Sequence, residues 1–376
     1  MLAAFALAYA LFEIPSGMLG DRIGPRKVFI RIVIWWSLFT AVTGLVNGLI
    51  SLIIIRFLFG AGESGTYPNS ILVVSRWFPV NENGKALSWV GIGSQLGSAL
   101  APLIIVPIAA AFGWRIPFFV IGTIGIVWVV FCYSWFRDFP SQMTSMPPSE
   151  KKMIELSCRH KEEQQLVPWK LIFRNSTLWP LMLMYFCCQW ANYFFIAWMP
   201  VYLQEGRGFS ENSMKNITSV LFLVGVSGFL AGGAAGDLLL KHKGLKKGRR
   251  LTGMLGLGSC GFLLWIAAIS SNNILTASCL IGANFSFSFS VMTSYAVCAD
   301  IGRNNSGTVT GAMNFFGQMG AFSLALIFGK IVQVTHRFDY PLYVLAIVLF
   351  SGCLLWLAID PEEALPFTEA NHGDQK

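Results

Sequence analysis

Arg56 and Glu63 are the two residues of this chain whose types and spacing most directly indicate chemistry. They lie in an apolar run, residues 49 to 63, that contains no other charged side chain and continues as an apolar segment to residue 75. A segment of this length can cross a bilayer, where an ionised side chain is costly and usually functional. Because seven residues are close to two helical turns, both side chains project from one helix face, about 10 Å apart along the axis. The pair predicts a polar wall within a membrane.

The two side chains have complementary chemistry. An arginine stays charged and presents a planar fork that binds both oxygens of a carboxylate, so Arg56 suits recognition of an organic anion. A carboxyl group near an arginine can exchange a proton as water access and anion binding change, which is what a proton-coupled carrier needs of Glu63. Two alternatives stay open: a structural Arg56 that pairs with Glu13 or Glu63, and a Glu63 that is its permanent counter-ion. Glu13, near the inner end of the first apolar segment, is a weaker candidate because that position can reach the interface.

Neutral polar side chains at membrane depth would bind the hydroxyl groups of such an anion. Tyr67 lies four residues beyond Glu63, on nearly the same helix face, and Gln95 lies among small residues that would expose it to a cavity. The second half of the chain offers further candidates: Gln189, Asn192, Tyr193, Asn284, Ser286, Ser288, Asn314 and Gln318. The alternative for each is a hydrogen bond that only joins two helices, worth about 1 kcal/mol.

The elements that position these residues are membrane spans. The chain has 376 residues, of which 55% are hydrophobic and 12% charged, and a mean hydropathy of +0.60. This composition is too apolar for a soluble protein of this size and indicates an all-α polytopic membrane protein. Apolar stretches of helical length predict eleven spans, at residues 1–19, 28–47, 49–75, 85–112, 115–136, 178–203, 213–240, 250–270, 274–299, 305–331 and 338–359.

The net charge of +8 follows the predicted topology rather than a nucleic-acid site. Of the 27 Lys and Arg residues, 21 fall in loops of one side and in the C-terminal tail, five fall in loops of the other side, and Arg56 lies within the membrane. The positive-inside rule then places the first residue outside and the C-terminus in the cytoplasm. We expect a lipid bilayer around the chain and no nucleic-acid partner.

Other residue patterns exclude several classes of site. The eight cysteines show no CxxC spacing, seven of them lie in apolar spans, and the four histidines lie in loops or tails. We therefore interpret the cysteines as packing residues and expect no metal site. We find no nucleophile and base constellation and no phosphate loop, so we expect neither an enzyme nor a cofactor, apart from the proton as coupling ion.

One polar connection divides the spans into five and six. We expect an N-terminal bundle (residues 1–137), a cytoplasmic linker (138–177), a C-terminal bundle (178–360) and a cytoplasmic tail (361–376). Within the linker, residues 147–156 are typical of a capped amphipathic helix at the inner membrane surface.

A short motif occurs in both halves. Glycines at the cytoplasmic end of a span precede an aspartate and a basic cluster, at residues 17–27 and again at 232–250. Small residues allow helices to approach closely, the aspartate can cap a neighbouring helix, and basic residues anchor the turn to the inner leaflet. The alternative is an ordinary positive-inside loop. The motif residues are Gly17, Gly20, Asp21, Arg22, Gly24, Arg26 and Lys27 in the first copy, and Asp237 in the second.

The first copy resembles the signature G-x-L-A/G-D-R-x-G-R-R/K of the major facilitator superfamily, except that Pro25 stands where the first basic residue usually lies. In that superfamily the signature lies between the second and third of twelve helices, and both termini are cytoplasmic. Here it follows the first predicted span, so we expect the major facilitator fold with eleven spans of twelve and the first helix absent.

Within that superfamily, the chain resembles the anion:cation symporter family, which includes bacterial hexuronate, aldonate and aldarate carriers. The resemblance extends from about Ala8 to Ile359 and rests on five segments: Arg56-x6-Glu63 with Pro68, Trp77-Phe78-Pro79, and residues 112–118, 193–203 and 307–315. It implies that Arg56 binds the substrate carboxylate, that Glu63 is the coupling acid, and that Gln95 and Asn314 contact substrate.

These observations together predict a secondary active transporter. We expect proton symport of a small organic anion, a sugar acid such as a hexuronate, aldonate or aldarate, by alternating access. The substrate-binding residues would be Arg56, Tyr67, Gln95, Asn192, Tyr193 and Asn314. We expect a monomer in the bacterial inner membrane. The alternative is a transport-inactive sensor or truncated carrier that binds the anion without flux.

Overall fold

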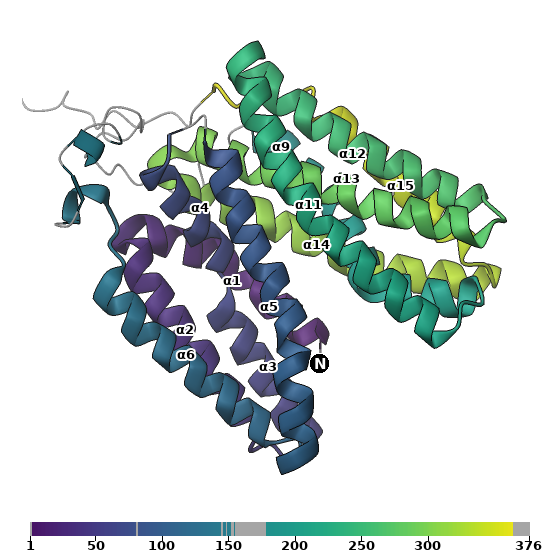
Figure 1. The fold of residues 1–376 in the computed structure, drawn as a ribbon, viewed down its shortest axis with the longest axis horizontal. Coiled ribbons are helices and arrows are strands. Elements are labelled where there is room, and N and C mark those ends of the chain that lie inside the picture. Colours follow the sequence, from purple (N-terminus) through teal and green to yellow (C-terminus); the bar gives the residue numbers. More distant parts are fainter. Residues whose placement is uncertain are drawn as a thin grey trace, which may run out of the picture.

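The computed structural model describes residues 2–79, 82–143, 146–147, 149–151, 154 and 178–363. Within these ranges the regular structure is helical, with no strand. The helices form two bundles, which Figure 1 shows with the first half of the chain in purple and blue and the second half in green and yellow. This confirms the predicted all-α class. The predicted amphipathic helix at 147–156 lies mostly outside the described residues.

The first bundle contains α1 (Leu2–Ile23), α2 (Pro25–Thr43), α3 (Leu49–Glu63), α4 (Thr66–Trp77), α5 (Asn83–Phe112) and α6 (Ile116–Trp135), followed by the short turn η1 (Pro140–Gln142). The second begins with α9 (Leu178–Tyr193), which continues through the π-helix η2 (Phe194–Trp198), α10 (Met199–Val201) and the π-helix η3 (Tyr202–Gly206). The remaining elements are α11 (Glu211–Lys243), α12 (Leu245–Ile269), α13 (Asn273–Gly302), η4 (Arg303–Asn305), α14 (Ser306–Thr335) and α15 (Asp339–Leu355).

The span predicted at residues 49–75 is broken in its middle. Helix α3 ends at Glu63, and Gly65 has a φ of 91° before α4 begins. Proline at 68 explains the break, because it lacks an N–H and its ring clashes with the carbonyl four residues earlier in a continuous helix. Glycine tolerates the positive φ, and a Cβ there would lie only 2.1 Å from Ser16 Oγ. The break therefore lies beside Glu63, within the predicted site.

Both copies of the repeated motif are more helical than the predicted turns. Helix α1 continues through Asp21 and Arg22 to Ile23, and α11 continues six residues beyond Asp237. The turns themselves are made by Gly24 and Gly244, which have φ values of 90° and 82°. The two aspartates consequently project from helices, where they can contact a neighbouring helix.

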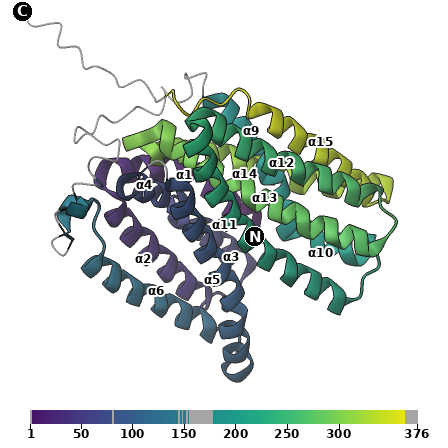
Figure 2. The same cartoon turned by 45° about the horizontal axis from the view of Figure 1, so that its top comes forward.

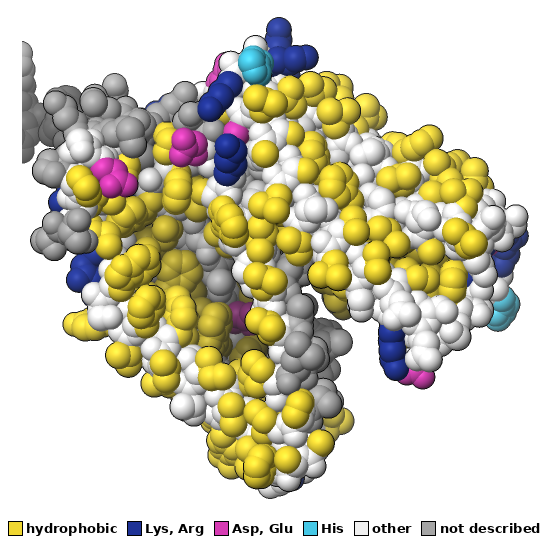
Figure 3. All heavy atoms as spheres, in the orientation of Figure 1, with side chains coloured by type: hydrophobic (Ala, Val, Ile, Leu, Met, Phe, Trp, Pro, Cys, Tyr) yellow, Lys and Arg dark blue, Asp and Glu magenta, His cyan; other side chains and the backbone are white. Residues whose placement is uncertain are grey.

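The outer faces of the bundles are apolar. Six helical segments in the described part of the chain are long and apolar enough to cross a membrane: Leu49–Trp77, Ile116–Trp135, Glu211–Lys243, Leu245–Ile269, Asn273–Gly302 and Ser306–Thr335. Large apolar side chains such as Val127, Phe131 and Leu354 are exposed, and Figure 3 shows such side chains across the outer surface with a hollow between the bundles. This distribution suits lipid-facing helices.

The two bundles meet mainly along two pairs of helices, and α4 adds contacts with α13 and α14. Helix α1 packs against α14, and α5 packs against α11; Figure 2 shows these central helices between the two bundles. The contact is tightest at the end that carries Asp21 and Asp237, which we call the motif end. Toward the opposite end the bundles diverge (Figure 1).

Candidate functional site

A cavity of about 790 Å³ lies between the two bundles. The first bundle contributes side chains from α1, α4 and α5, and the second contributes side chains from α9, η2, α11, α13 and α14. Its polar lining residues are Tyr9, Tyr67, Ser94, Tyr185, Gln189, Asn192, Thr218, Ser219, Asn284, Ser288, Tyr295, Asn314 and Gln318. The remaining wall is mostly aromatic and aliphatic, which is typical of a site for a small polar ligand.

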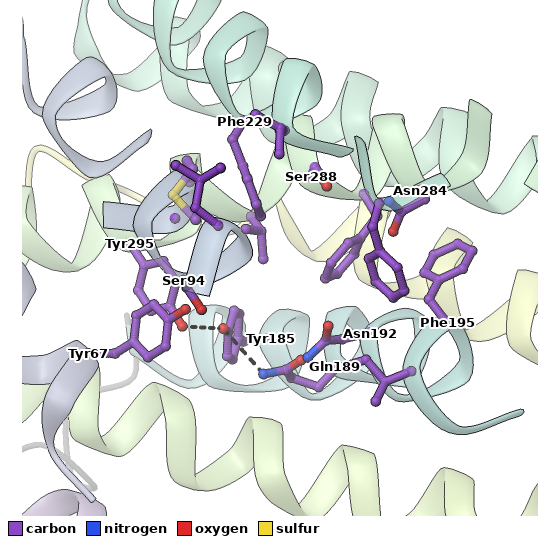
Figure 4. A pocket seen from close by; sticks show the side chains of 18 of the residues that line it. Tyr67, Ser94, Tyr185, Gln189, Asn192, Phe195, Phe229, Asn284, Ser288 and Tyr295 are labelled. Atoms are coloured by element: carbon purple, nitrogen blue, oxygen red, sulfur yellow. Dashed lines mark hydrogen bonds between the residues drawn. The ribbon is translucent and has the colours of Figure 1, made fainter. Parts of the chain in front are cut away.

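Four of these side chains form a connected group across the bundle interface. The rings of Tyr67 and Tyr295 stack with centroids 5.3 Å apart and planes 6° apart. The hydroxyl groups of Tyr295 and Tyr185 are 2.7 Å apart, and Gln189 Nε2 donates to the Tyr185 hydroxyl at 3.4 Å. Figure 4 shows this group along one wall of the cavity. The stacked pair joins α4 of the first bundle to α13 of the second.

The hydrogen-bonded group continues to a buried acid. Tyr295 Oη donates to Asn314 Oδ1 at 3.4 Å, and Asn314 Nδ2 donates to Glu13 Oε1 at 2.7 Å. Glu13 has no exposed surface and lies ten residues before the end of α1, about 15 Å along the axis. The structure thus places Glu13 in the bundle interface, away from the membrane surface that the sequence suggested.

The predicted substrate residues are only partly brought together. Tyr67, Asn192 and Asn314 line the cavity, whereas Arg56 and Tyr193 do not belong to its lining. Tyr193 instead packs against the apolar core of the second bundle. Gln95 lies in α5, and its side chain is outside the described part of the chain.

Arg56 lies on α3, which packs against α1 and α2. Its guanidinium carbon lies 5.7 Å from the centroid of the Phe59 ring. Among the described residues, no carboxylate oxygen lies within 4.0 Å of its nitrogens. The alternative of an Arg56 paired with Glu13 or Glu63 therefore has no ion pair in this conformation.

Glu63 is the last residue of α3 and is half-buried beside the helix break. Its carbonyl accepts a hydrogen bond from Thr66 Oγ1 at 2.8 Å. Its carboxylate is within electrostatic range of Glu13 and Tyr9. Because the helix is interrupted at residue 65, the sequence argument that set Tyr67 on the same continuous helix face no longer applies, although Tyr67 does reach the cavity.

At the motif end, each bundle caps a helix of the other. Asp21 Oδ1 accepts from the Gly307 N–H at 3.0 Å, and Oδ2 accepts from the Thr308 N–H at 2.7 Å and from the Thr308 hydroxyl. A carboxylate at a helix N-terminus satisfies free N–H groups and complements the helix dipole. The first bundle thereby holds the start of α14.

The second copy of the motif makes the reciprocal contact, from the second bundle to the first. Asp237 accepts from the N–H of Gly84 at 3.1 Å and from that of Lys85 at 2.9 Å, at the start of α5. It also faces Arg249 at 3.5 Å, and Arg249 is bound to Asp300 at 3.0 Å. These groups are buried, so the contact is shielded from water.

Glycines make this close approach possible. A Cβ on Gly17 would lie 2.2 Å from the carbonyl oxygen of Gly307, and a Cβ on Gly233 would lie 2.4 Å from the carbonyl oxygen of Gly84. Within the first bundle, a Cβ on Gly20 would lie 2.0 Å from Asn69 Oδ1. The basic residues of the motif behave differently: Arg22 and Lys27 are exposed. Arg26 donates its backbone N–H to Asp138 at 2.7 Å, within the first bundle.

A family model described as the Major Facilitator Superfamily matches residues 1–325. The chain belongs to the major facilitator superfamily. The predicted fold is confirmed, and the protein is an integral, multi-pass membrane transporter rather than an enzyme. In this superfamily member, the cavity between the bundles is the candidate transport site.

Comparisons with individual proteins give the same assignment. A probable sulfoacetate transporter of Cupriavidus necator is 30% identical over 368 residues, which cover 96% of this chain and 84% of that protein. The hexuronate transporter of Bacillus subtilis is 29% identical over 346 residues, which cover 90% and 80% respectively. A solved proton:xylose symporter bound to 6-bromo-6-deoxy-D-glucose matches with a TM-score of 0.72 at 13% identity, covering 96% of this chain and 87% of that structure. That last match supports the fold alone.

Of the four tyrosines that line the cavity, only Tyr67 was predicted from the sequence. Tyr9, Tyr185 and Tyr295 line the cavity, yet a tyrosine in an apolar span has no spacing signal that separates it from a packing residue. The charge of Glu13 in the first span was the one sequence signal that pointed to this part of the site, because ionisable residues within spans are functional candidates.

Asp21→Asn is expected to loosen the motif end, because an amide has one acceptor oxygen and no charge for the two N–H groups of α14. Charge-assisted hydrogen bonds contribute about 1.5–3 kcal/mol each, and a loss of about 2 kcal/mol shifts the closed-to-open ratio about 30-fold. Hydrogen–deuterium exchange of residues 306–312, measured by mass spectrometry in nanodiscs, should become faster.

Asp138→Asn is the matched control, since Asp138 accepts a backbone N–H within one bundle. It should leave exchange at the start of α14 unchanged. Equal exchange in wild type and Asp21→Asn would contradict the assignment of Asp21 as an inter-bundle cap.

Proposed function

We propose that this transporter is a secondary active carrier that moves a small organic anion, a sugar acid, together with protons by alternating access. The observation that carries the proposal is the polar cavity between two bundles that are joined at one end by the reciprocal aspartate caps. The relatives described above are a probable sulfoacetate transporter and a hexuronate transporter, and sulfoacetate and hexuronates are both small organic anions with several oxygen atoms.

The chemistry of the surroundings fits an anion with hydroxyl groups. Arg56 lies outside the cavity lining in this conformation and has no acid partner within 4.0 Å among the described residues. We propose that it supplies the fork for the substrate carboxylate. Gln189 Oε1 is buried without a hydrogen-bond partner in the structure and can accept a substrate hydroxyl. Further contacts are proposed from Tyr67, Gln95, Asn192, Tyr193 and Asn314, and Glu63 is proposed as a proton-coupling acid.

Transport follows from the arrangement of the two bundles. The motif end is closed, and the cavity extends from Asn314 toward Thr218 near the start of α11, at the opposite end. Rocking of the bundles would break the two aspartate caps and give the cavity access to the motif end. The Lys and Arg distribution favours a cytoplasmic motif end, and with that orientation the structure would be an outward-facing state. We propose that the carrier is a monomer in a bacterial inner membrane.

The proposal is tested with purified transporter in proteoliposomes. Sulfoacetate, D-glucuronate, D-galactonate and galactarate are offered with and without an acidic exterior. We expect uptake of at least one sugar acid that the pH gradient accelerates. Binding of these anions without flux would instead support the sensor alternative, and neither binding nor flux would contradict the proposed substrate class.

A further inference from the structure

We propose that Glu13 is a second proton-carrying residue of the transporter, which holds its proton while the motif end is closed and releases it when α14 moves away from α1. This inference rests on the proposed proton symport. It concerns a residue that sequence analysis had ranked below Glu63.

The contacts of Glu13 favour an uncharged carboxyl group in the closed conformation. Its Oε1 accepts one hydrogen bond from Asn314, and its Oε2 is buried with no hydrogen-bond partner among the described residues. Among the described residues, no Lys, Arg or His nitrogen lies within 4.0 Å of it. An ionised carboxylate buried without a cation is far costlier than a neutral carboxyl with one unsatisfied hydroxyl.

The other groups around Glu13 add no cation at close range. The carboxyl group of Glu63 is within electrostatic range of Glu13, and two nearby carboxyl groups are not readily ionised together. Arg31 on α2 is engaged by Ser16 at 3.0 Å. The titratable groups within electrostatic range of Glu13 are Tyr9 on α1, Glu63 on α3, Tyr67 on α4, Tyr185 on α9 and Tyr295 on α13. The other charged groups on α1 and on the elements packed against it are Asp21 and Arg22 on α1, Arg26, Lys27 and Arg31 on α2, Arg56 on α3, Arg76 on α4, Arg303 in η4 and Lys330 on α14.

Glu13 is linked to the cavity by a chain of hydrogen bonds with a single direction. Asn314 donates to Glu13, and Tyr295 donates to Asn314. Because the hydroxyl proton of Tyr295 is donated to Asn314, the hydroxyl group of Tyr185 must be the donor in its bond with Tyr295. Gln189 in turn donates to Tyr185. A substrate that binds the Asn314 or Gln189 amide therefore changes the hydrogen bonding of the carboxyl group.

The same bond crosses the interface that must open. Glu13 and Asn314 lie on α1 and α14, the pair of helices that Asp21 also joins at the motif end. When these helices separate, Glu13 loses the one hydrogen bond that its carboxyl group makes among the described residues, and water reaches its carboxyl group. Hydration stabilises the carboxylate, so the proton leaves toward the cytoplasm in the step that exposes the substrate to that side.

A second proton changes the electrical balance of transport. One proton with a monoanion is electroneutral, whereas two protons with a monoanion move one net positive charge inward. An inside-negative potential of 100 mV then raises the equilibrium accumulation ratio about 50-fold. Transport of a monoanion with one proton, carried by Glu63 alone, would be insensitive to the membrane potential.

The test uses full-length transporter in proteoliposomes with a potassium and valinomycin potential and equal pH on both sides. The probe is radiolabelled D-glucuronate or D-galactonate, both monoanions, whichever is taken up faster. We expect accumulation by the wild type to rise about 50-fold at 100 mV, and accumulation by Glu13→Gln to be insensitive to the potential. Glutamine keeps an acceptor for Asn314, and substrate counterflow by this variant shows that it is folded and binds.

The exposed acid Glu211 provides the matched control, and Glu211→Gln should respond to potential as the wild type does. Proton-driven uptake by the wild type that ignores the potential, or a Glu13→Gln variant that retains the full response, would overturn the inference and leave the proposed symport intact. Absence of proton-driven uptake of every sugar acid offered, these two probes and galactarate included, would overturn the proposed function, and this inference with it.

Discussion

Arg56→Gln is expected to lower the kcat/KM for anion uptake about 100-fold. A charge-assisted contact with a carboxylate in a partly dry site contributes about 3 kcal/mol, which corresponds to this factor. The side chain has no acid partner within 4.0 Å among the described residues, and its guanidinium carbon lies 5.7 Å from the Phe59 ring centroid. Its charge is thus not used in an ion pair among the described residues, and the side chain lies outside the cavity lining in this conformation. Initial uptake rates across a range of anion concentrations, in proteoliposomes, measure the effect.

Two variants make this result specific. Arg56→Lys keeps the charge but not the planar fork, so we expect an intermediate loss. Arg115→Gln removes an exposed arginine that bonds Asn47 at 2.8 Å and lies over the Trp114 ring, and it should leave uptake unchanged. An Arg56→Gln transporter with wild-type kcat/KM would show that the anion is bound elsewhere.

With a pH gradient of one unit, Glu63→Gln is expected to lower anion accumulation about tenfold, because one proton fewer moves in each cycle. Glu63 ends α3 at the helix break, within electrostatic range of Glu13. Counterflow exchange, which needs no net proton movement, should persist in this variant. The Glu13→Gln/Glu63→Gln double variant should exchange substrate but accumulate none.

Both the single and the double variant are measured as equilibrium accumulation at several external pH values, with counterflow as the control for folding and binding. Undiminished uphill accumulation by Glu63→Gln would reject its coupling role. Loss of counterflow together with accumulation would instead assign Glu63 to substrate binding.

The fold could be predicted from the sequence because membrane spans are recognisable by their length and hydropathy. The apolar runs indicate the helices, and the uneven distribution of Lys and Arg between the loops of the two sides indicates the orientation, without knowledge of how the helices pack. The two aspartate motifs were also recognisable, since glycines and an aspartate before a basic cluster occur twice. What hydropathy did not show was the interruption after Glu63, where the local effects of Gly65 and Pro68 break one apolar run into two helices.

The candidate site was less accessible, because it depends on contacts between distant parts of the chain. Glu13 and Asn314 are 301 positions apart and meet only when α1 packs on α14. Tyr67 stacks on Tyr295 across the same interface. Helical periodicity fixes which residues share a face of one helix, but not which faces of the two bundles meet. Arg56 and Glu63 were found by their charge alone, and their chemistry was predicted without their neighbours.

Proton flux driven by substrate tests the central claim most directly. Purified transporter is reconstituted into lightly buffered proteoliposomes with no pH gradient and no potential, and an inward gradient of D-galactonate or D-glucuronate is applied while an enclosed dye reports internal pH. Proton symport should produce internal acidification that depends on the transporter and on the sugar acid. Uptake of the labelled anion with no change in internal pH would contradict proton symport.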